Sequence, residues 1–254
     1  MEWQEIGGNW VLIPYKPKAI VHFLGGAFLA TTPSITYRCL LEQIANGGYA
    51  VIATAFVNTF DHLAIAQYVL NSFENCLDRL KATNSIKQYL PIYGLGHSMG
   101  CKLHLLLCSV FSVERAGNIF ISFNNFTARE AVPGLSQMPA LVNLEFTPSP
   151  EETNRLVAKN YQIKRNLLIK FNSDTIDRSL NLNDLLRPRF CDMVTLLKLN
   201  GNHLTPVGQD VNWGVGPVFT PMDAVGQWMK QEAYRDLNQL KREILRWLNP
   251  MAPV

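Results

Sequence analysis

The sequence predicts an α/β fold with a doubly wound, mostly parallel sheet, and three observations support this. Short apolar runs recur along the chain, stretches with helical periodicity separate them, and the two types alternate. Alternating strands and helices build a parallel sheet covered by helices on both faces. A chain of 254 residues, 48% of them hydrophobic and 17% charged, can bury such a sheet within one domain, residues 1–254.

Seven apolar runs are the candidate strands. From the second run onward they lack alternation of polar and apolar residues, which is typical of strands buried on both faces of a parallel sheet. In chain order the runs are residues 10–13, 19–24, 49–53, 90–95, 118–123, 166–171 and 193–198.

The predicted helices lie between these runs. Residues 36–46 end at Gly47-Gly48, a common helix stop, and residues 61–80 begin at Asp61, a candidate N-cap. Two further helices are expected over residues 99–111 and around 179–186.

A last helix is predicted over residues 222–248. Its apolar residues recur at helical spacing, so we expect it to pack on the sheet. A membrane-surface or partner role for Trp228 and Trp247 is the alternative. The apolar positions are Val225, Trp228, Met229, Leu237, Leu240, Ile244 and Leu248.

Residues 126–164 interrupt the alternation with four prolines and mixed polarity. Long insertions in compact domains are usually functional, and this one is expected to form a small helical lid over the strand ends. An ordinary surface excursion with two helices is the alternative. Thr147 to Glu152 is expected to cap one short helix. The apolar residues of the predicted lid are Phe126, Leu135, Met138, Leu141, Leu144 and Phe146.

Composition excludes several classes of function. The net charge of +3 is spread along the chain, so no nucleic-acid partner is expected. The first five residues lack the features of a secretory signal, and no apolar run is long enough to span a bilayer. The five cysteines are scattered without a Cys-x-x-Cys pair, which favours a reducing compartment. We expect neither a metal nor another cofactor.

The pattern Gly96-His97-Ser98-Met99-Gly100 carries the chemistry. A strand precedes it and an apolar helix follows it, which is the context in which G-x-S-x-G presents a nucleophilic serine on a sharp turn. The two glycines are needed because a Cβ at either position would collide with the neighbouring strand or helix. Ser98 is therefore the candidate nucleophile.

A serine hydroxyl needs a base to take its proton. The partners of such a serine follow it in the order acid, then histidine. His203 lies in a loop after the late strand 193–198, so it is the candidate base, whereas His104 on the following helix is expected to be a core residue.

The acid should follow the strand 166–171. Asp174 lies in the turn after this strand, where it could orient the imidazole and stabilise the imidazolium ion. Asp177 is the reserve, and Asp184 is also a candidate. Asp174 or Asp177 could instead cap the helix around residues 179–186.

Acyl transfer also needs hydrogen-bond donors for an oxyanion. In this arrangement they are the backbone N–H after the nucleophile, here Met99, and one from a loop after an earlier strand. The glycine-rich loop after the strand 19–24 fits the second position, and Gly26 or Ala27 is the expected donor.

With these motifs in place, the chain resembles the α/β-hydrolase superfamily over almost its whole length. More narrowly, it is similar to a family of unknown function from cyanobacteria and plastids (domain of unknown function 1350). The similar segments are residues 23–28, 94–104, 121–126, 145–153 and 201–206. The resemblance implies a photosynthetic source, with the protein in the cyanobacterial cytoplasm or the plastid stroma, and a peripheral association with thylakoid membranes or complexes as a further possibility.

The preferred functional hypothesis is a serine hydrolase acting on an ester or thioester. The apolar side chains of the predicted lid favour a small-molecule or lipid-like substrate with an apolar acyl group. The alternative is a non-catalytic binding or assembly protein of photosynthetic complexes, because a fold does not fix a function. A third hypothesis uses the same residues for acyl transfer to an acceptor other than water, or for haloperoxidase or lyase chemistry.

Overall fold

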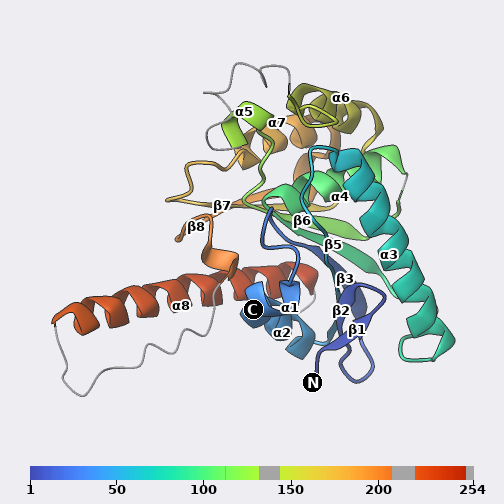
Figure 1. Ribbon diagram of the computed structural model, residues 1–254, viewed down its shortest axis with the longest axis horizontal. Helices are drawn as coiled ribbons and strands as arrows, with labels where there is room; N and C mark the ends of the chain where they lie inside the picture. The colour runs from blue at the N-terminus through green and yellow to red at the C-terminus, as the bar shows by residue number, and fades with distance from the viewer. Residues whose placement is uncertain (112, 132–143, 208–220, 250–254) are drawn as a thin grey trace.

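The computed structural model describes residues 1–254 except 112, 132–143, 208–220 and 250–254, and for 221–233 it describes the helix but no side chains. One sheet of eight strands runs through the molecule in the order β1-β2-β4-β3-β5-β6-β7-β8. The first two strands are antiparallel and the strands from β3 to β8 are parallel. The predicted doubly wound, mostly parallel sheet is confirmed (Figure 1).

All seven predicted strands are present, and one short strand was not predicted. β1 has three residues that are mostly exposed, so it gave no apolar run. The strands are β1 (Gln4–Ile6), β2 (Asn9–Leu12), β3 (Ala19–Leu24), β4 (Tyr49–Thr54), β5 (Ile92–His97), β6 (Gly117–Ile121), β7 (Asn166–Phe171) and β8 (Val194–Leu199).

The expectation that every later strand is buried on both faces is wrong for β8. This strand pairs only with β7, at the edge of the sheet, and Thr195 and Lys198 are exposed. An edge strand has one neighbour, and charged side chains such as Lys198 are a common means of protecting its free side. The inner strands β3, β4 and β6 are buried along their whole length.

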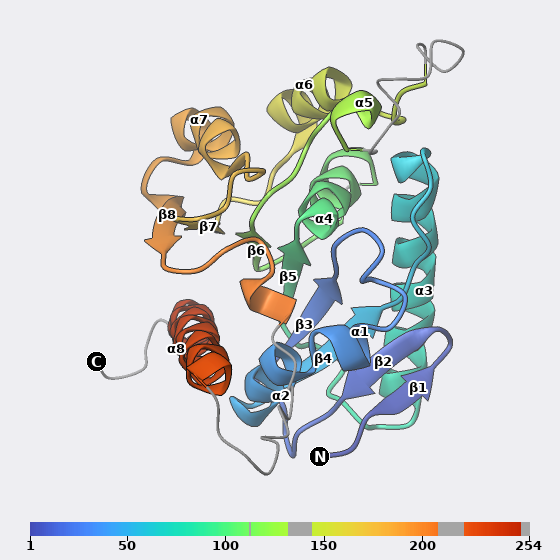
Figure 2. The same ribbon diagram turned by 60° about the vertical axis from the view of Figure 1, so that its left-hand side comes forward.

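The helices form two layers (Figure 2). α2 and α8 contribute buried residues such as Leu41 and Ile244 to one face of the sheet. α3, α4, α6 and α7 cover the other face, with residues such as Val69 and Leu106. The helices are α1 (Pro33–Thr36), α2 (Arg38–Asn46), α3 (His62–Ala82), α4 (Met99–Val110), α5 (Ala128–Ala131), α6 (Pro150–Asn160), α7 (Ser179–Phe190) and α8 (Pro221–Leu248).

The C-terminal half of α8 packs on the sheet as predicted, through Leu237, Leu240, Ile244 and Leu248. Trp247 also points inward: the Arg165 guanidinium lies 3.9 Å from the centre of its ring. Trp247 is thus partly buried and packs against the core, and the partner role considered for it remains a prediction. Val225, Trp228 and Met229 lie outside the described side chains.

The insertion is helical at both ends. α6 begins with the expected cap, because the Ser149 hydroxyl accepts from the Glu152 N–H and the Glu152 carboxylate accepts from the Ser149 N–H. Val157 of α6 is buried in the main body. Leu135, Met138 and Leu141 of the predicted lid lie outside the described residues. In the described part of the chain, no helix is both long and apolar enough to cross a membrane.

Sheet register positions the functional loops. Leu24 of β3 lies opposite Gly96 of β5, and His97 lies opposite Ile121 of β6. β7 and β8 end together, with Phe171 opposite Leu199. The loops that follow these parallel strands therefore meet at one edge of the sheet, where ligands bind in open α/β sheets.

Candidate active site

Ser98 occupies a strained turn between β5 and α4. Its φ is 54° and its ψ is −118°, outside the regions that L-residues favour. A Cβ added to Gly96 would lie 2.6 Å from the Cys101 nitrogen, and one added to Gly100 would lie 2.0 Å from the Leu24 oxygen. Both contacts are with backbone, so the expected steric need for glycine on each side of Ser98 is confirmed.

The three predicted residues Ser98, His203 and Asp174 lie in hydrogen-bond contact. Nε2 of His203 is 3.0 Å from Oγ of Ser98, and Nδ1 of His203 is 2.8 Å from Oδ2 of Asp174. An ionised carboxylate only accepts hydrogen bonds, so Nδ1 of His203 carries the proton. The lone pair of Nε2 is then directed at the Ser98 hydroxyl, as a general base requires.

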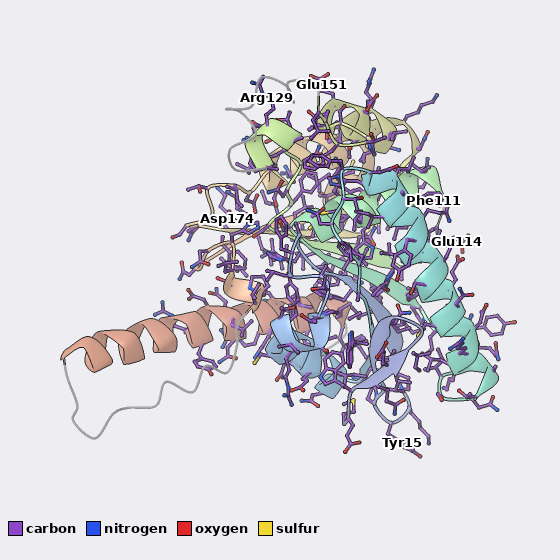
Figure 3. The ribbon with its side chains drawn as sticks, viewed as in Figure 1. Tyr15, Phe111, Glu114, Arg129, Glu151 and Asp174 are labelled. Atoms are coloured by element: carbon purple, nitrogen blue, oxygen red, sulfur yellow. The ribbon has the colours of Figure 1, made fainter. Side chains whose placement is uncertain are left out.

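Asp174 is held in its charged form. Its side chain is fully buried, and burial alone would raise its pKa, but the hydrogen bond from His203 and the nearby Ser122 hydroxyl lower the pKa below its usual value. The Ile176 N–H donates to its second oxygen at 3.0 Å. A fixed negative charge therefore faces the imidazole. Figure 3 shows Asp174 on the side of the molecule formed by β7 and β8, away from Tyr15.

The other two acid candidates lie elsewhere. The Asp177 carboxylate accepts from the Ser179 N–H at 2.6 Å and from the Ser179 hydroxyl at 3.2 Å, at the start of α7. Burial raises the pKa of Asp177, although these bonds and Lys170 oppose the shift. Asp184 is exposed on α7. Asp174 is thus the one of the three that contacts His203.

Two backbone donors are free for an oxyanion. Among the described residues, neither the Met99 N–H nor the Ala27 N–H has a hydrogen-bond partner, and both residues line the cavity at Ser98. The prediction of Gly26 as a donor is wrong, because its N–H already donates to the Tyr37 hydroxyl at 2.8 Å. Of the three predicted donors, Met99 and Ala27 therefore keep an available N–H within the described residues.

Two residues that the sequence did not indicate hold this loop and the histidine together. Nε2 of His97 lies 2.9 Å from the carbonyl oxygen of His203, and Nδ1 lies 2.8 Å from the Tyr37 hydroxyl. Burial and the nearby His203 lower the pKa of His97 to about 3, so its ring is neutral. Since a carbonyl only accepts, Nε2 donates to His203, Nδ1 accepts from Tyr37, and Tyr37 in turn accepts from Gly26.

A cavity of about 360 Å³ opens at Ser98, within the range of small-molecule sites. Phe28, Ile176 and Leu204 line it and are exposed. Inside are two buried polar residues that the sequence analysis did not single out, Lys102 and His62. The remaining lining includes Leu29, Asn58, Asn124, Asn125, Phe126, Glu130, Ala131 and Phe146. In the described part of the chain, no group of three His, Cys, Asp or Glu side chains is arranged to bind a metal.

Two solved structures similar to this chain are named as lipases. A soluble variant of monoglyceride lipase from Saccharomyces cerevisiae is 12% identical, with a TM-score of 0.61, and the match covers 100% of this chain and 96% of that one. Monoacylglycerol lipase from Paleococcus ferrophilus is 14% identical, with a TM-score of 0.58 and coverage of 99% and 100%. At these identities the likeness shows the fold alone, and the α/β-hydrolase fold is confirmed.

A third similar structure is the fluorophosphonate-binding serine hydrolase F of Staphylococcus aureus. It is 15% identical, with a TM-score of 0.56, and the match covers 90% of this chain and 91% of that one. No curated protein matches this chain in sequence. The family described as "Protein of unknown function (DUF1350)" matches residues 2–250.

Proposed function

Because this chain belongs to the DUF1350 family of proteins of unknown function and has an α/β-hydrolase fold, we propose that it is a serine hydrolase that cleaves an ester or thioester. The observation that carries the proposal is the continuous contact from Ser98 through His203 to Asp174 at the edge of an open cavity. A serine, a histidine and a buried carboxylate in this order are the parts of a nucleophilic triad.

Each residue then has a defined role. His203 takes the proton of the Ser98 hydroxyl as Oγ attacks the substrate carbonyl, and Asp174 stabilises the imidazolium ion. The Met99 and Ala27 N–H groups donate to the oxyanion of the tetrahedral intermediate. His203 then gives its proton to the leaving alcohol or thiol. In the second half, His203 takes a proton from water as the water oxygen attacks the acyl-enzyme. His203 then returns the proton to Oγ of Ser98, and the carboxylic acid is released.

The cavity supports a substrate with an apolar part. Phe28 and Leu204 line it with side chains that are 80% and 60% exposed, and exposed apolar patches mark sites of ligand or membrane contact. The monoglyceride and monoacylglycerol lipases among the similar structures act, by their names, on acylated glycerols. An acyl ester of small or medium length fits both observations.

The insertion 126–164 is proposed to cover this cavity. Phe126, Glu130 and Ala131 from its first part and Phe146 from its second line the cavity. The segment before α6 is attached to the body, because the Thr147 N–H donates to the Phe60 oxygen and the Leu63 N–H to the Thr147 oxygen. A cover anchored in this way restricts access of water to the acyl-enzyme.

A series of 4-nitrophenyl esters with acyl chains of two to twelve carbons tests the proposal. We expect the wild type to hydrolyse them with an optimum at an intermediate length, and Ser98→Ala to lose at least about 10³-fold in kcat/KM. Equal rates for the two proteins would contradict it, because the observed hydrolysis would then not depend on Ser98.

A further inference from the structure

The cavity holds a buried cation that the triad does not use. Lys102 lies on α4 four residues after Ser98 and is 2% exposed. Its ammonium group donates to the Pro148 oxygen at 2.8 Å, and this is its one hydrogen bond within the described residues. A lysine ammonium has three N–H donors, so two of them lack a partner in the described part of the chain.

No carboxylate neutralises this charge at ion-pair distance within the described residues. Glu145 and Glu152 attract Lys102 from farther away, but each accepts from backbone: Glu145 from Ala128 and Phe146, Glu152 from Ser149. Glu130 lines the same cavity, where it is half exposed and accepts from Thr127. Burial lowers the pKa of Lys102 to about 8, which still leaves it protonated at neutral pH.

His62, at the start of α3, lies beside this cation. Its ring stacks on Phe146 with the centres 4.3 Å apart, and the Lys102 ammonium is 5.7 Å from the centre of the same Phe146 ring. His62 is 4% exposed, and neither ring nitrogen has a hydrogen-bond partner within the described residues. Burial and the charge of Lys102 lower the pKa of His62 to about 3. The neutral ring therefore offers one unused N–H donor.

From these contacts we propose that Lys102 and His62 form a subsite for a negatively charged group, a carboxylate or a phosphate, carried by the ester that Ser98 cleaves. This inference rests on the proposed hydrolase function. An unpaired buried ammonium and an unpaired buried imidazole are costly, and an anion that accepts from both relieves both costs. The charge also favours substrates that are anionic over neutral esters of the same length.

The position of the subsite limits the substrate. One turn of α-helix rises about 5.4 Å, so Lys102 begins about one turn beyond Ser98, and both residues line one cavity. The anionic group must then lie a few bonds from the scissile carbonyl, on the acyl side or on the alcohol side. The apolar residues Phe28, Ile176 and Leu204 contact the other part of the molecule.

Matched pairs of esters test the subsite on both sides of the scissile bond. The acyl-side pair is the 4-nitrophenyl monoester of adipic acid and 4-nitrophenyl hexanoate. The alcohol-side pair is hexanoylglycerol 3-phosphate and hexanoylglycerol. We expect the wild type to prefer the charged member of one pair by at least about tenfold in kcat/KM, a change of about 1.4 kcal/mol, and the pair that shows it identifies the side.

Two variants from different helices separate charge recognition from folding. Lys102→Met removes the ammonium and is expected to abolish the preference. His62→Phe keeps the stacked ring but removes its nitrogens, and is expected to reduce the preference severalfold. Lys159→Met is the control: it makes the same lysine-to-methionine change at an exposed position of α6 and should keep the preference. A wild type that shows no preference for the charged member of either pair, or a preference unchanged in Lys102→Met, would overturn the proposal.

Binding to the inactive Ser98→Ala protein makes the test independent of catalysis. Calorimetric titration with adipic acid monoamide against hexanamide, and with glycerol 3-phosphate against glycerol, should show binding of one anion that is lost in the Ser98→Ala, Lys102→Met double variant. Absence of binding by both anions would overturn the subsite even if Ser98 is an active nucleophile. Binding without any turnover would support the subsite and reject the hydrolase.

Discussion

Nε2 of His97 donates to the main-chain carbonyl of His203 across 2.9 Å, so the residue before the proposed nucleophile holds the backbone of the proposed base. The same ring accepts from Tyr37, which accepts from Gly26 in the loop that carries the Ala27 donor. One neutral, buried imidazole therefore links the loop after β8 to the loop after β3. The positions of the proposed base and of the proposed oxyanion donor therefore depend on the same three hydrogen bonds.

Tyr37→Phe tests this link. The variant leaves the buried His97 Nδ1 and Gly26 N–H without partners, so we expect a loss of about 1–3 kcal/mol in the free energy of unfolding. We also expect kcat to fall about tenfold with little change in KM, because Tyr37 does not line the cavity. Urea denaturation and ester kinetics measure both. Tyr89→Phe, at a residue 96% exposed, is the matched control, and an unchanged kcat in Tyr37→Phe would show that the link does not position the base.

Asp174→Asn tests the acid. The amide presents N–H groups as well as oxygen, so it no longer fixes the proton on Nδ1 of His203 or stabilises the imidazolium ion, and we expect kcat to fall about 10³- to 10⁴-fold. Asp177→Asn is the matched control, because Asp177 accepts from Ser179 and does not contact His203. It should change stability and keep kcat within a few-fold. The reverse result would move the role of the acid to Asp177.

Lys102→Met tests the cost of the buried cation through its pH dependence. The pKa of Lys102 is about 8 in the folded protein against an ordinary 10.5, so between these values the unfolded chain binds a proton that the folded chain does not. Lowering the pH through this window destabilises the fold, and the full penalty is present below pH 8. We expect Lys102→Met to raise the free energy of unfolding at pH 7 by about 2 kcal/mol, after allowing for the lost bond to Pro148.

Urea denaturation at several pH values measures this effect. The advantage of Lys102→Met over the wild type should shrink as the pH rises from 8 to 10.5, because only above 10.5 is the wild-type lysine neutral in both states. Lys159→Met, at an exposed position, should show no such dependence. If the difference in free energy of unfolding between Lys102→Met and wild type stayed constant with pH, burial would not lower the pKa of Lys102.

Much of the fold could be predicted because its signals are local. The inner strands are continuous apolar runs. Ser98 lies between a strand and a helix, and Gly96 and Gly100 flank it because backbone packs too closely there for a side chain. β1 was missed because three mostly exposed residues give no pattern. The exposed face of β8 was missed because an edge position depends on the order of strands in space, which the sequence does not state.

The site could be predicted only where chain order and motif identify a residue. Ser98, His203 and Asp174 follow the expected order, and the structure brings them together. The glycine-rich loop predicted Gly26 as an oxyanion donor, but its N–H donates to the Tyr37 hydroxyl, eleven residues farther along the chain. Lys102 and His62 come from two helices, and both lie against Phe146 in one cavity. No characteristic spacing in the sequence signals such a pairing of residues from two helices.

Reaction with a fluorophosphonate probe, read by intact mass, tests the central claim that Ser98 is an activated nucleophile. The proteins are the wild type, Ser98→Ala, His203→Ala and the control His104→Ala, whose ring lies in the core and contacts the Leu95 oxygen; each is first shown to be folded by circular dichroism. We predict one adduct on the wild type and on His104→Ala, none on Ser98→Ala, and a rate lower by at least about 10³-fold on His203→Ala. No adduct on the folded wild type would contradict the account and favour a protein that uses this cavity for binding alone.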